Sequence, residues 1–242
     1  MRQSRIFTSQ HLQVETSVQL EGPASHYLTR VLRLSKGDDV ILFNGDGSDY
    51  SAVISEIRPQ RVLARVTASS TPGNESPLKI TLAQSVCRGE RMDYVLQKAT
   101  ELGVFCIQPL ISQRVEVRFD ASRQEKRLSH WRGVVTSACE QSGRALVPEV
   151  KKPMSLPDWI NDTAGPVRLV LDPLAAHRLS GVSVQEGSVS VLVGPEGGFT
   201  DDEMNAARAN GLVAVSLGPR VLRTETAGPA AIALLQAKSG DF

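Results

Sequence analysis

The hydrophobic pattern of the chain changes near residue 78, and this change restricts the fold more than any other feature. From Leu78 onward, apolar strand-like runs alternate with helical patterns, beginning with "LKITLAQSV" and "RMDYVLQKATELG". Such alternation is typical of a mostly parallel sheet covered by helices. The sequence therefore predicts an α/β domain here. Its further expected elements are a helix over Ser122–Ser142, strands over Val167–Leu171, Val189–Val193 and Val213–Leu217, and a last helix.

The residues before this point follow a different pattern. Runs such as "DDVILFNG" and "RVLARVTA" are short, rich in β-branched residues and separated by turn-forming residues. We expect a small antiparallel β-barrel, with a hairpin turn at Asn44–Gly47 and one short helix over Pro23–Leu32. The polar, proline- and glycine-containing stretch that follows predicts a linker. The predicted domains are residues 1–70 and 78–242, joined by a linker over residues 71–77.

Composition narrows the class of protein. The chain has 242 residues, of which 41% are hydrophobic and 22% charged, with a net charge of +1. These values are typical of a globular protein of about two domains. No apolar run approaches the roughly 18 residues of a membrane helix, and the N-terminus lacks an apolar signal core, so we expect a cytoplasmic protein without a membrane span. Because the cysteines, Cys87, Cys106 and Cys139, are far apart in sequence, we expect buried reduced thiols and no metal site.

The stretch "SVSVLVGPEGGFTDDE", Ser188–Glu203, joins a buried strand to a helix through unusually bare backbone. Thr200 and Glu203 have the spacing of a capping box, which predicts a helix beginning at this point. Three glycines lie between Gly194 and Gly198, although an ordinary turn needs only one. Glycine is used where φ is positive or where another group lies against the main chain. This junction therefore predicts a ligand-binding loop.

Two other strands also end in loops rich in turn-forming residues, "LDP" at Leu171–Pro173 and "LGPRVLRTET" at Leu217–Thr226. Ligands of open α/β sheets bind beyond the carboxyl ends of the strands. The dinucleotide and P-loop motifs are missing, and neither glycine-containing loop has a lysine to meet a triphosphate. Backbone donors, apolar walls and one carboxylate, Glu196, fit S-adenosylmethionine better than ATP, although an adenine-nucleotide enzyme stays open at this point.

Several motifs together resemble one family. These are "GPEGGF", "LGPRVLRTETA", "RGERMDYVLQKATELGV" and "EQSGR…VPE", with "RIF" and "HYLTRVLR" near the N-terminus. They resemble the bacterial methyltransferases that modify N3 of a uridine in 16S ribosomal RNA of the small ribosomal subunit. That family belongs to the SPOUT superfamily, and the resemblance runs essentially end to end. It implies a PUA-like RNA-binding β-barrel followed by a trefoil-knotted SPOUT domain, S-adenosylmethionine as the methyl donor, and a homodimer.

The resemblance and the loop positions together give candidate site residues. For the cofactor they are Leu171, Gly194, Glu196, Gly197, Leu217, Gly218 and Leu222. For catalysis they are Arg220 or Arg223, which would stabilise negative charge on the pyrimidine, and Glu196, the nearest carboxylate. For RNA they are Arg5, Arg30 and Arg33 in the first domain, and Arg114 and Arg144 in the second.

One stretch departs from the family pattern. After Thr226 the chain continues as Ala227-Gly228-Pro229, where the family usually continues directly into a helix. Proline is tolerated in the first helical turn but not deeper. We therefore expect the last helix to begin near Thr226.

Three other functions stay open from the sequence. The first is a non-catalytic RNA-binding module, for which the C-terminal domain would serve only as a dimerisation platform. The second is the adenine-nucleotide enzyme. The third is a knotted methyltransferase that acts on another RNA, either a base of transfer RNA or a ribose 2′-hydroxyl.

Overall fold

The change of pattern near residue 78 corresponds to two separate sheets. The computed structural model describes residues 4–116, 121–162, 165, 167–184 and 187–242. By their internal contacts these form two units, residues 1–75 with 136–147, and residues 76–135 with 148–242. The structure does not test the domain boundaries at residues 70 and 78, which stay a prediction.

The N-terminal unit is built on a five-stranded sheet with the order β1-β3-β4-β5-β2. Its elements are β1 (Arg5–Phe7), β2 (Ser17–Glu21), α1 (Gly22–His26) with a following π-helix (Tyr27–Val31), β3 (Asp39–Phe43), β4 (Asp49–Arg58) and β5 (Arg61–Ser70). The pair β1–β3 is parallel and the other pairs are antiparallel. Alternate strand residues, among them Val40, Leu42, Ala52 and Ile54, form its core. The predicted hairpin and short helix are confirmed.

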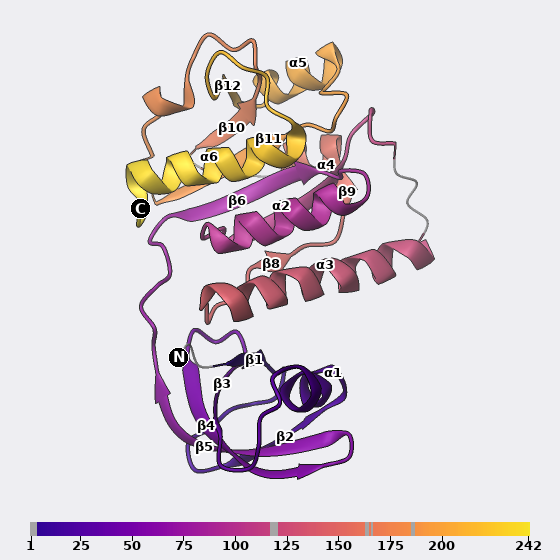
Figure 1. The fold of residues 1–242 in the computed structure, drawn as a ribbon. Coiled ribbons are helices and arrows are strands. Elements are labelled where there is room, and N and C mark those ends of the chain that lie inside the picture. The colour runs from indigo at the N-terminus through magenta and orange to yellow at the C-terminus, as the bar shows by residue number, and fades with distance from the viewer. Residues whose placement is uncertain (1–3, 117–120, 163–164, 166, 185–186) are drawn as a thin grey trace. The chain divides into compact units, whose positions relative to one another are not determined.

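The C-terminal unit is built on a parallel seven-stranded sheet (Figure 1), as the alternation predicted. Its strands are β6 (Lys79–Ser85), β7 (Cys106–Ile111), β8 (Glu149–Val150), β9 (Met154–Ser155), β10 (Arg168–Leu171), β11 (Ser188–Val193) and β12 (Val213–Val215). Its helices are α2 (Glu90–Glu101), α4 (Leu156–Asp162), a 3₁₀ turn (Leu179–Gly181), α5 (Asp201–Ala209) and α6 (Thr224–Ser239). The helix α3 (Ala121–Ser142) begins in this unit, and its last residues belong to the N-terminal unit.

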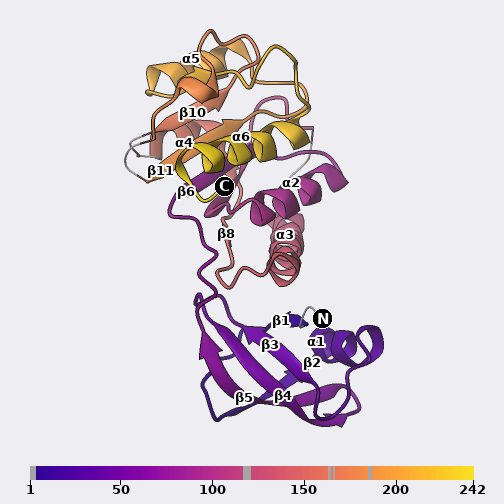
Figure 2. The same cartoon turned by 60° about the vertical axis from the view of Figure 1, so that its left-hand side comes forward.

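Helices cover both faces of this sheet. Ala83 and Leu192 pack with Trp159 of α4 and Ala207 of α5 on one face. Helices α2 and α6 lie side by side (Figures 1 and 2), and α6 packs on β6 and β11. The carboxyl ends of the strands therefore stay accessible along one edge of the sheet.

Most of the strands and helices that the hydrophobic pattern did not predict are short. The strands β1, β8 and β9 have two or three residues each, which is too few for a recognisable alternation. Helix α4 has seven residues and lies next to a proline-rich stretch. Its apolar residues still follow helical spacing, because Leu156, Trp159 and Ile160 are buried.

The last helix begins earlier than expected. Helix α6 starts at Thr224 rather than near Thr226, and Pro229 lies inside it. Proline has no N–H to donate to the preceding turn. The expectation that Pro229 would lie in the first turn of the helix was therefore wrong. The neighbouring Gly228 explains the packing, because a Cβ there would lie 3.2 Å from Oε1 of Gln84 and 3.4 Å from Leu82. The departure from the family pattern thus lets α6 lie close against β6.

The described residues contain no helix with the length and apolarity needed to cross a membrane. Within the same residues, no three His, Cys, Asp or Glu side chains are grouped so that they could hold a metal ion. The three cysteines are free and buried, as predicted.

Candidate functional site

The loops after β10, β11 and β12 meet at one edge of the sheet. These strands are parallel neighbours in the order β12-β10-β11, so their carboxyl ends lie together. The loops enclose a pocket of about 870 Å³, which is within the usual range for small-molecule sites. The predicted juxtaposition of the three loops is confirmed.

This pocket brings together most of the residues predicted for the cofactor. Those that line it are Leu171, Gly194, Glu196, Gly197, Leu217 and Leu222. Gly218 lies in the same loop as Leu217 with φ of +128°, a conformation that favours glycine, but it is not a lining residue. The two candidate catalytic arginines, Arg220 and Arg223, line the pocket as well. Both are exposed, and neither forms an ion pair with another described residue.

The bare backbone of the "GPEGG" loop has identifiable causes. Gly198 has φ of +68°. A Cβ at Gly194 would lie 3.2 Å from the ring of Phe199, and one at Gly197 would lie 3.4 Å from Arg114. A Cβ would therefore be tight at Gly194, whereas at Gly197 it would make an ordinary van der Waals contact. The pocket is open along the rest of the loop.

The capping box that opens α5 is confirmed. Glu203 donates its backbone N–H to Oγ1 of Thr200 at 3.2 Å, and Thr200 donates its own N–H to the Glu203 carboxylate at 2.8 Å. The other carboxylate oxygen of Glu203 accepts the N–H of Gln113 at 2.7 Å. The carboxylate thus fixes the helix start and also the chain that follows β7.

The side chain of Thr224 joins two of the pocket loops, a role that no sequence motif indicates. Its hydroxyl donates to the carbonyl of Gly194 at 2.6 Å and accepts from Nε2 of Gln84 at 3.0 Å. Both side chains are buried. The start of α6 is therefore tied to the "GPEGG" loop and to the core of β6.

Replacing Thr224 with valine should lower the free energy of unfolding by about 1–3 kcal/mol, because the Gly194 carbonyl and the Gln84 amide lose a buried partner. Chemical denaturation followed by circular dichroism measures this change. The matched variant Thr224→Ser keeps the hydroxyl and should lose less than half as much. A larger loss for serine than for valine would mean that the γ-methyl group, rather than the hydroxyl, matters.

Cys87 lies beside this link as a buried thiol. Its Sγ lies 3.7 Å from Oγ1 of Thr224. Burial raises the pKa of the Cys87 thiol to about 12, and Cys87 is not among the residues that line the pocket. The arrangement therefore favours a structural role for this cysteine.

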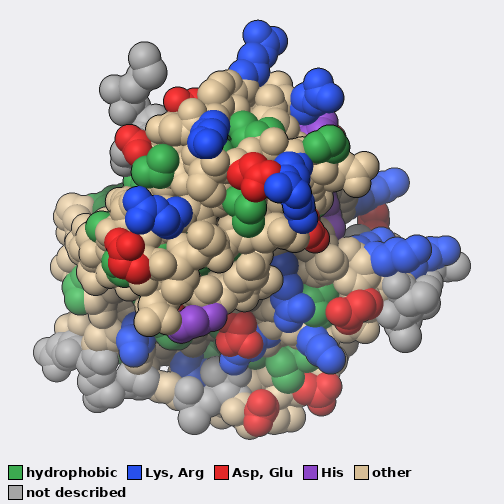
Figure 3. Space-filling view, turned by 90° about the horizontal axis from the view of Figure 1, so that it is seen from below, with side chains coloured by type: hydrophobic (Ala, Val, Ile, Leu, Met, Phe, Trp, Pro, Cys, Tyr) green, Lys and Arg blue, Asp and Glu red, His purple; other side chains and the backbone are tan. Residues whose placement is uncertain are grey.

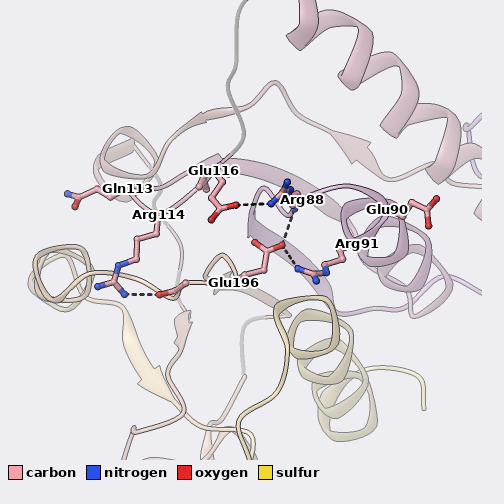
Figure 4. Close-up of a pocket in the computed structure, with 9 residues that line it drawn as sticks. Arg88, Glu90, Arg91, Gln113, Arg114, Glu116 and Glu196 are labelled. Carbon is pink, nitrogen blue, oxygen red and sulfur yellow. Dashed lines mark hydrogen bonds and ion pairs between the residues drawn. The ribbon is translucent and has the colours of Figure 1, made fainter.

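Glu196, in the middle of the "GPEGG" loop, is held from two sides (Figure 4). Its Oε1 accepts the backbone N–H of Arg88 at 3.1 Å and a guanidinium N–H of Arg91 at 2.9 Å. Burial alone would raise the pKa of Glu196, but these hydrogen bonds and the charge of Arg91 outweigh it and lower that pKa. The carboxylate is therefore ionised at neutral pH and a weak proton acceptor. These contacts favour a role in holding the loop, and proton abstraction by Glu196 stays a prediction.

A second, charged pocket shares Arg91, Glu196 and Gly197 with the first. Its lining includes three arginines and three glutamates, Arg88, Arg91, Arg114, Glu90, Glu116 and Glu196 (Figure 4). The charges balance, so the pocket has no excess positive charge. Arg114, predicted to bind RNA, donates to the carbonyls of Gly197 at 2.7 Å and Phe199 at 3.3 Å. Its guanidinium thus supports the cofactor loop from outside.

The remaining RNA-binding candidates lie in the N-terminal unit and divide into two kinds. The Arg5 side chain is only 7% exposed and pairs with Asp49, and the Arg144 side chain is equally buried and pairs with Glu75. Arg30 and Arg33 are exposed. Burial gives Arg5 and Arg144 a structural role, and RNA contact by all of these arginines stays a prediction.

Known proteins identify the two parts of the chain. Residues 74–236 match the model of the "RNA methyltransferase domain" family, and residues 20–67 match the "RNA methyltransferase PUA domain". The chain belongs to the RNA methyltransferase family. The resemblance seen in the sequence motifs is thereby confirmed, as is an α/β methyltransferase fold preceded by a PUA domain. The trefoil knot itself stays a prediction.

Relatives match along almost the whole chain. The "Ribosomal RNA small subunit methyltransferase E" of Buchnera aphidicola (Schizaphis graminum strain) is 34% identical over 98% of this chain and 97% of its own length. The protein of that name from Mycobacterium tuberculosis is 35% identical over 89% of this chain and 83% of its own length.

Two solved structures are similar over the full length of both chains. A Legionella pneumophila protein solved in complex with its cofactor SAM has a TM-score of 0.97 and 38% identity, and covers 100% of each chain. A Neisseria gonorrhoeae ribosomal RNA small subunit methyltransferase E bound to S-adenosylmethionine has a TM-score of 0.93 and 39% identity, with the same coverage.

Proposed function

We propose that this chain transfers a methyl group from S-adenosylmethionine to N3 of a specific uridine in 16S ribosomal RNA of the small subunit. The observation that carries the proposal is the full-length similarity to two structures solved with bound S-adenosylmethionine. The relatives' names, which specify RNA of the small ribosomal subunit, support the choice of substrate. In this proposal residues 1–70 bind RNA, residues 78–242 carry the reaction, and the enzyme is a cytoplasmic homodimer.

The pocket residues fit this cofactor. Leu171, Leu217 and Leu222 supply apolar walls for an adenine ring, and the loop backbone around them supplies hydrogen-bonding groups. Asp172 and Glu225 also line the pocket, and their carboxylates suit a cationic or hydroxylated ligand. The lining contains no lysine, and its basic residues are Arg91, Arg220 and Arg223. When bound, S-adenosylmethionine supplies a methyl group activated by a positively charged sulfur.

The chain's own residues would position the uracil and stabilise its charge. N3 of uracil carries a proton that must leave, and the base must be unpaired or turned out of a helix to be reached. Arg220 and Arg223 lie at the pocket with free guanidinium groups, so either can stabilise negative charge on the pyrimidine oxygens. Glu196 is bound by Arg91, so it holds the loop more readily than it accepts the proton.

Two measurements test the proposal. Isothermal titration should show binding of S-adenosylmethionine and weaker or no binding of ATP. A non-catalytic RNA-binding module predicts no heat with S-adenosylmethionine, and an adenine-nucleotide enzyme predicts the opposite order of affinities. Mass mapping of nucleosides should find one N3-methyluridine missing from the 16S ribosomal RNA of a strain that lacks this gene. Loss of a transfer RNA methyl group or a ribose methyl group instead would contradict the choice of substrate.

A further inference from the structure

The first helix of the N-terminal unit ends in a wide turn that carries unpacked side chains. Helix α1 continues as a π-helix over Tyr27–Val31, where Leu32 donates its N–H to the carbonyl of Tyr27 at 2.9 Å. Arg33 then has φ of +55°, which is uncommon for a residue other than glycine. Short π-helical turns are rare and occur often at functional sites. Leu28 is fully buried and anchors the turn in the core.

Two apolar side chains of this turn face outward. Tyr27 is 42% exposed and Val31 is 58% exposed. They are four residues apart and therefore lie on the same side of a helical turn. These partly exposed tyrosine and valine side chains form a small apolar platform, which suits a flat aromatic partner.

Two arginines and a histidine lie next to this platform along the chain. His26, Arg30 and Arg33 are exposed, and none of their side chains forms a hydrogen bond or an ion pair with another described residue. By contrast, Arg5 and Arg144 are paired with carboxylates, and Arg114 is bound to two carbonyls. The segment over residues 23–34 contains no acidic residue. Positive charge therefore gathers next to the exposed aromatic ring.

The charge balance of the chain makes this local arrangement informative. On the face drawn in Figure 3, basic side chains are mixed with acidic ones, and apolar side chains form only small separate patches. Because the chain has a net charge of only +1, recognition of a polyanion has to rely on local groups rather than on a general field. Aromatic stacking platforms beside free arginines are the usual way of binding single-stranded nucleic acid.

We propose that His26, Tyr27, Arg30, Val31 and Arg33, here called the Tyr27 surface, bind single-stranded RNA. Tyr27 stacks on an unpaired base, and Arg30 and Arg33 contact the flanking phosphates. This inference rests on the proposed function, since it assumes that the substrate is RNA. It adds that the N-terminal unit binds an unpaired stretch of that RNA rather than a duplex.

The experiment measures fluorescence anisotropy of a labelled single-stranded oligouridylate of about 12 nucleotides, a length within the usual site sizes of such proteins. Tyr27→Ala should weaken binding about ten-fold, because stacking is worth roughly 1–3 kcal/mol per base. Tyr27→Phe keeps the ring and should bind within about two-fold of the natural protein. In a salt titration, Tyr27→Ala should leave the slope of affinity against salt unchanged, whereas Arg30→Gln with Arg33→Gln should reduce it.

Matched controls separate this surface from other exposed groups. Tyr94 on α2 is 49% exposed, so Tyr94→Ala should leave oligonucleotide affinity unchanged. Arg65→Gln, another exposed arginine of the same unit, should leave the salt slope almost unchanged. Equal affinity of Tyr27→Ala and the natural protein, or equally tight binding of a duplex of the same length, overturns the Tyr27 surface. Titration with S-adenosylmethionine and the nucleoside mapping do not depend on this surface. Failure of those two experiments alone would contradict the proposed function and leave the Tyr27 surface standing.

Discussion

Replacing Arg220 with alanine should lower kcat for RNA methylation about 100-fold, the usual effect of removing one group that stabilises charge in the transition state. The affinity for S-adenosylmethionine should stay within about two-fold, since the apolar walls and the loop backbone are unchanged. Single-turnover kinetics and isothermal titration measure the two quantities. Arg220→Lys keeps a positive charge and should recover part of the rate.

Arg223 is the alternative candidate and should be measured in the same way. Both guanidinium groups lie at the pocket, so the residue that contacts the pyrimidine is the one whose alanine variant has the larger loss of kcat. Arg178 is exposed and is not part of the pocket lining, which makes Arg178→Ala a control for the loss of surface charge. Unchanged kcat in both Arg220→Ala and Arg223→Ala would remove the assignment of these residues to catalysis.

Replacing Arg144 with methionine should lower the free energy of unfolding by about 2–3 kcal/mol. Breaking a buried ion pair usually costs more, but Glu75 keeps some exposure, so solvent screens part of the loss. The two side chains form a two-pronged interaction, from Nε to Oε1 at 3.0 Å and from Nη2 to Oε2 at 2.6 Å. Equilibrium denaturation with guanidinium chloride measures the change.

A double-mutant cycle with Glu75→Gln isolates the pair itself. We expect a coupling energy above about 1 kcal/mol between Arg144 and Glu75. The same variants discriminate between the two roles for Arg144, because a structural role predicts that RNA affinity of the folded variant is nearly unchanged. Weak RNA binding combined with full stability would show instead that Arg144 contacts RNA.

Features that depend on neighbouring residues could be predicted from the sequence. The capping box of Thr200 and Glu203 is complete within four residues, so its pattern is visible in the chain. The placement of the candidate loops at the carboxyl ends of strands also followed from the sequence pattern. That three of these loops lie side by side was implied by the family resemblance, which together with the loop positions gave Leu171, Gly194 and Leu217 as candidates.

Features that depend on distant partners could not be predicted. The burial of Arg5 depends on Asp49, and that of Arg144 on Glu75, 69 residues away. The residues next to an arginine in the sequence do not indicate whether a distant carboxylate will form an ion pair with it. The packing of Phe199 against Gly194 likewise could not be predicted, because it depends on how the loop folds back on itself.

The contact between Gln84 and Thr224 has a consequence for how the molecule is made. It joins the first strand of the C-terminal unit to its last helix, across 140 positions. Contacts so far apart form late, since the chain between them must first be ordered. Because translation delivers the N-terminal part first, several strands of the C-terminal unit can fold before the last pocket loop and α6 have been synthesised. The ability to bind the methyl donor is thus acquired only when synthesis is nearly complete.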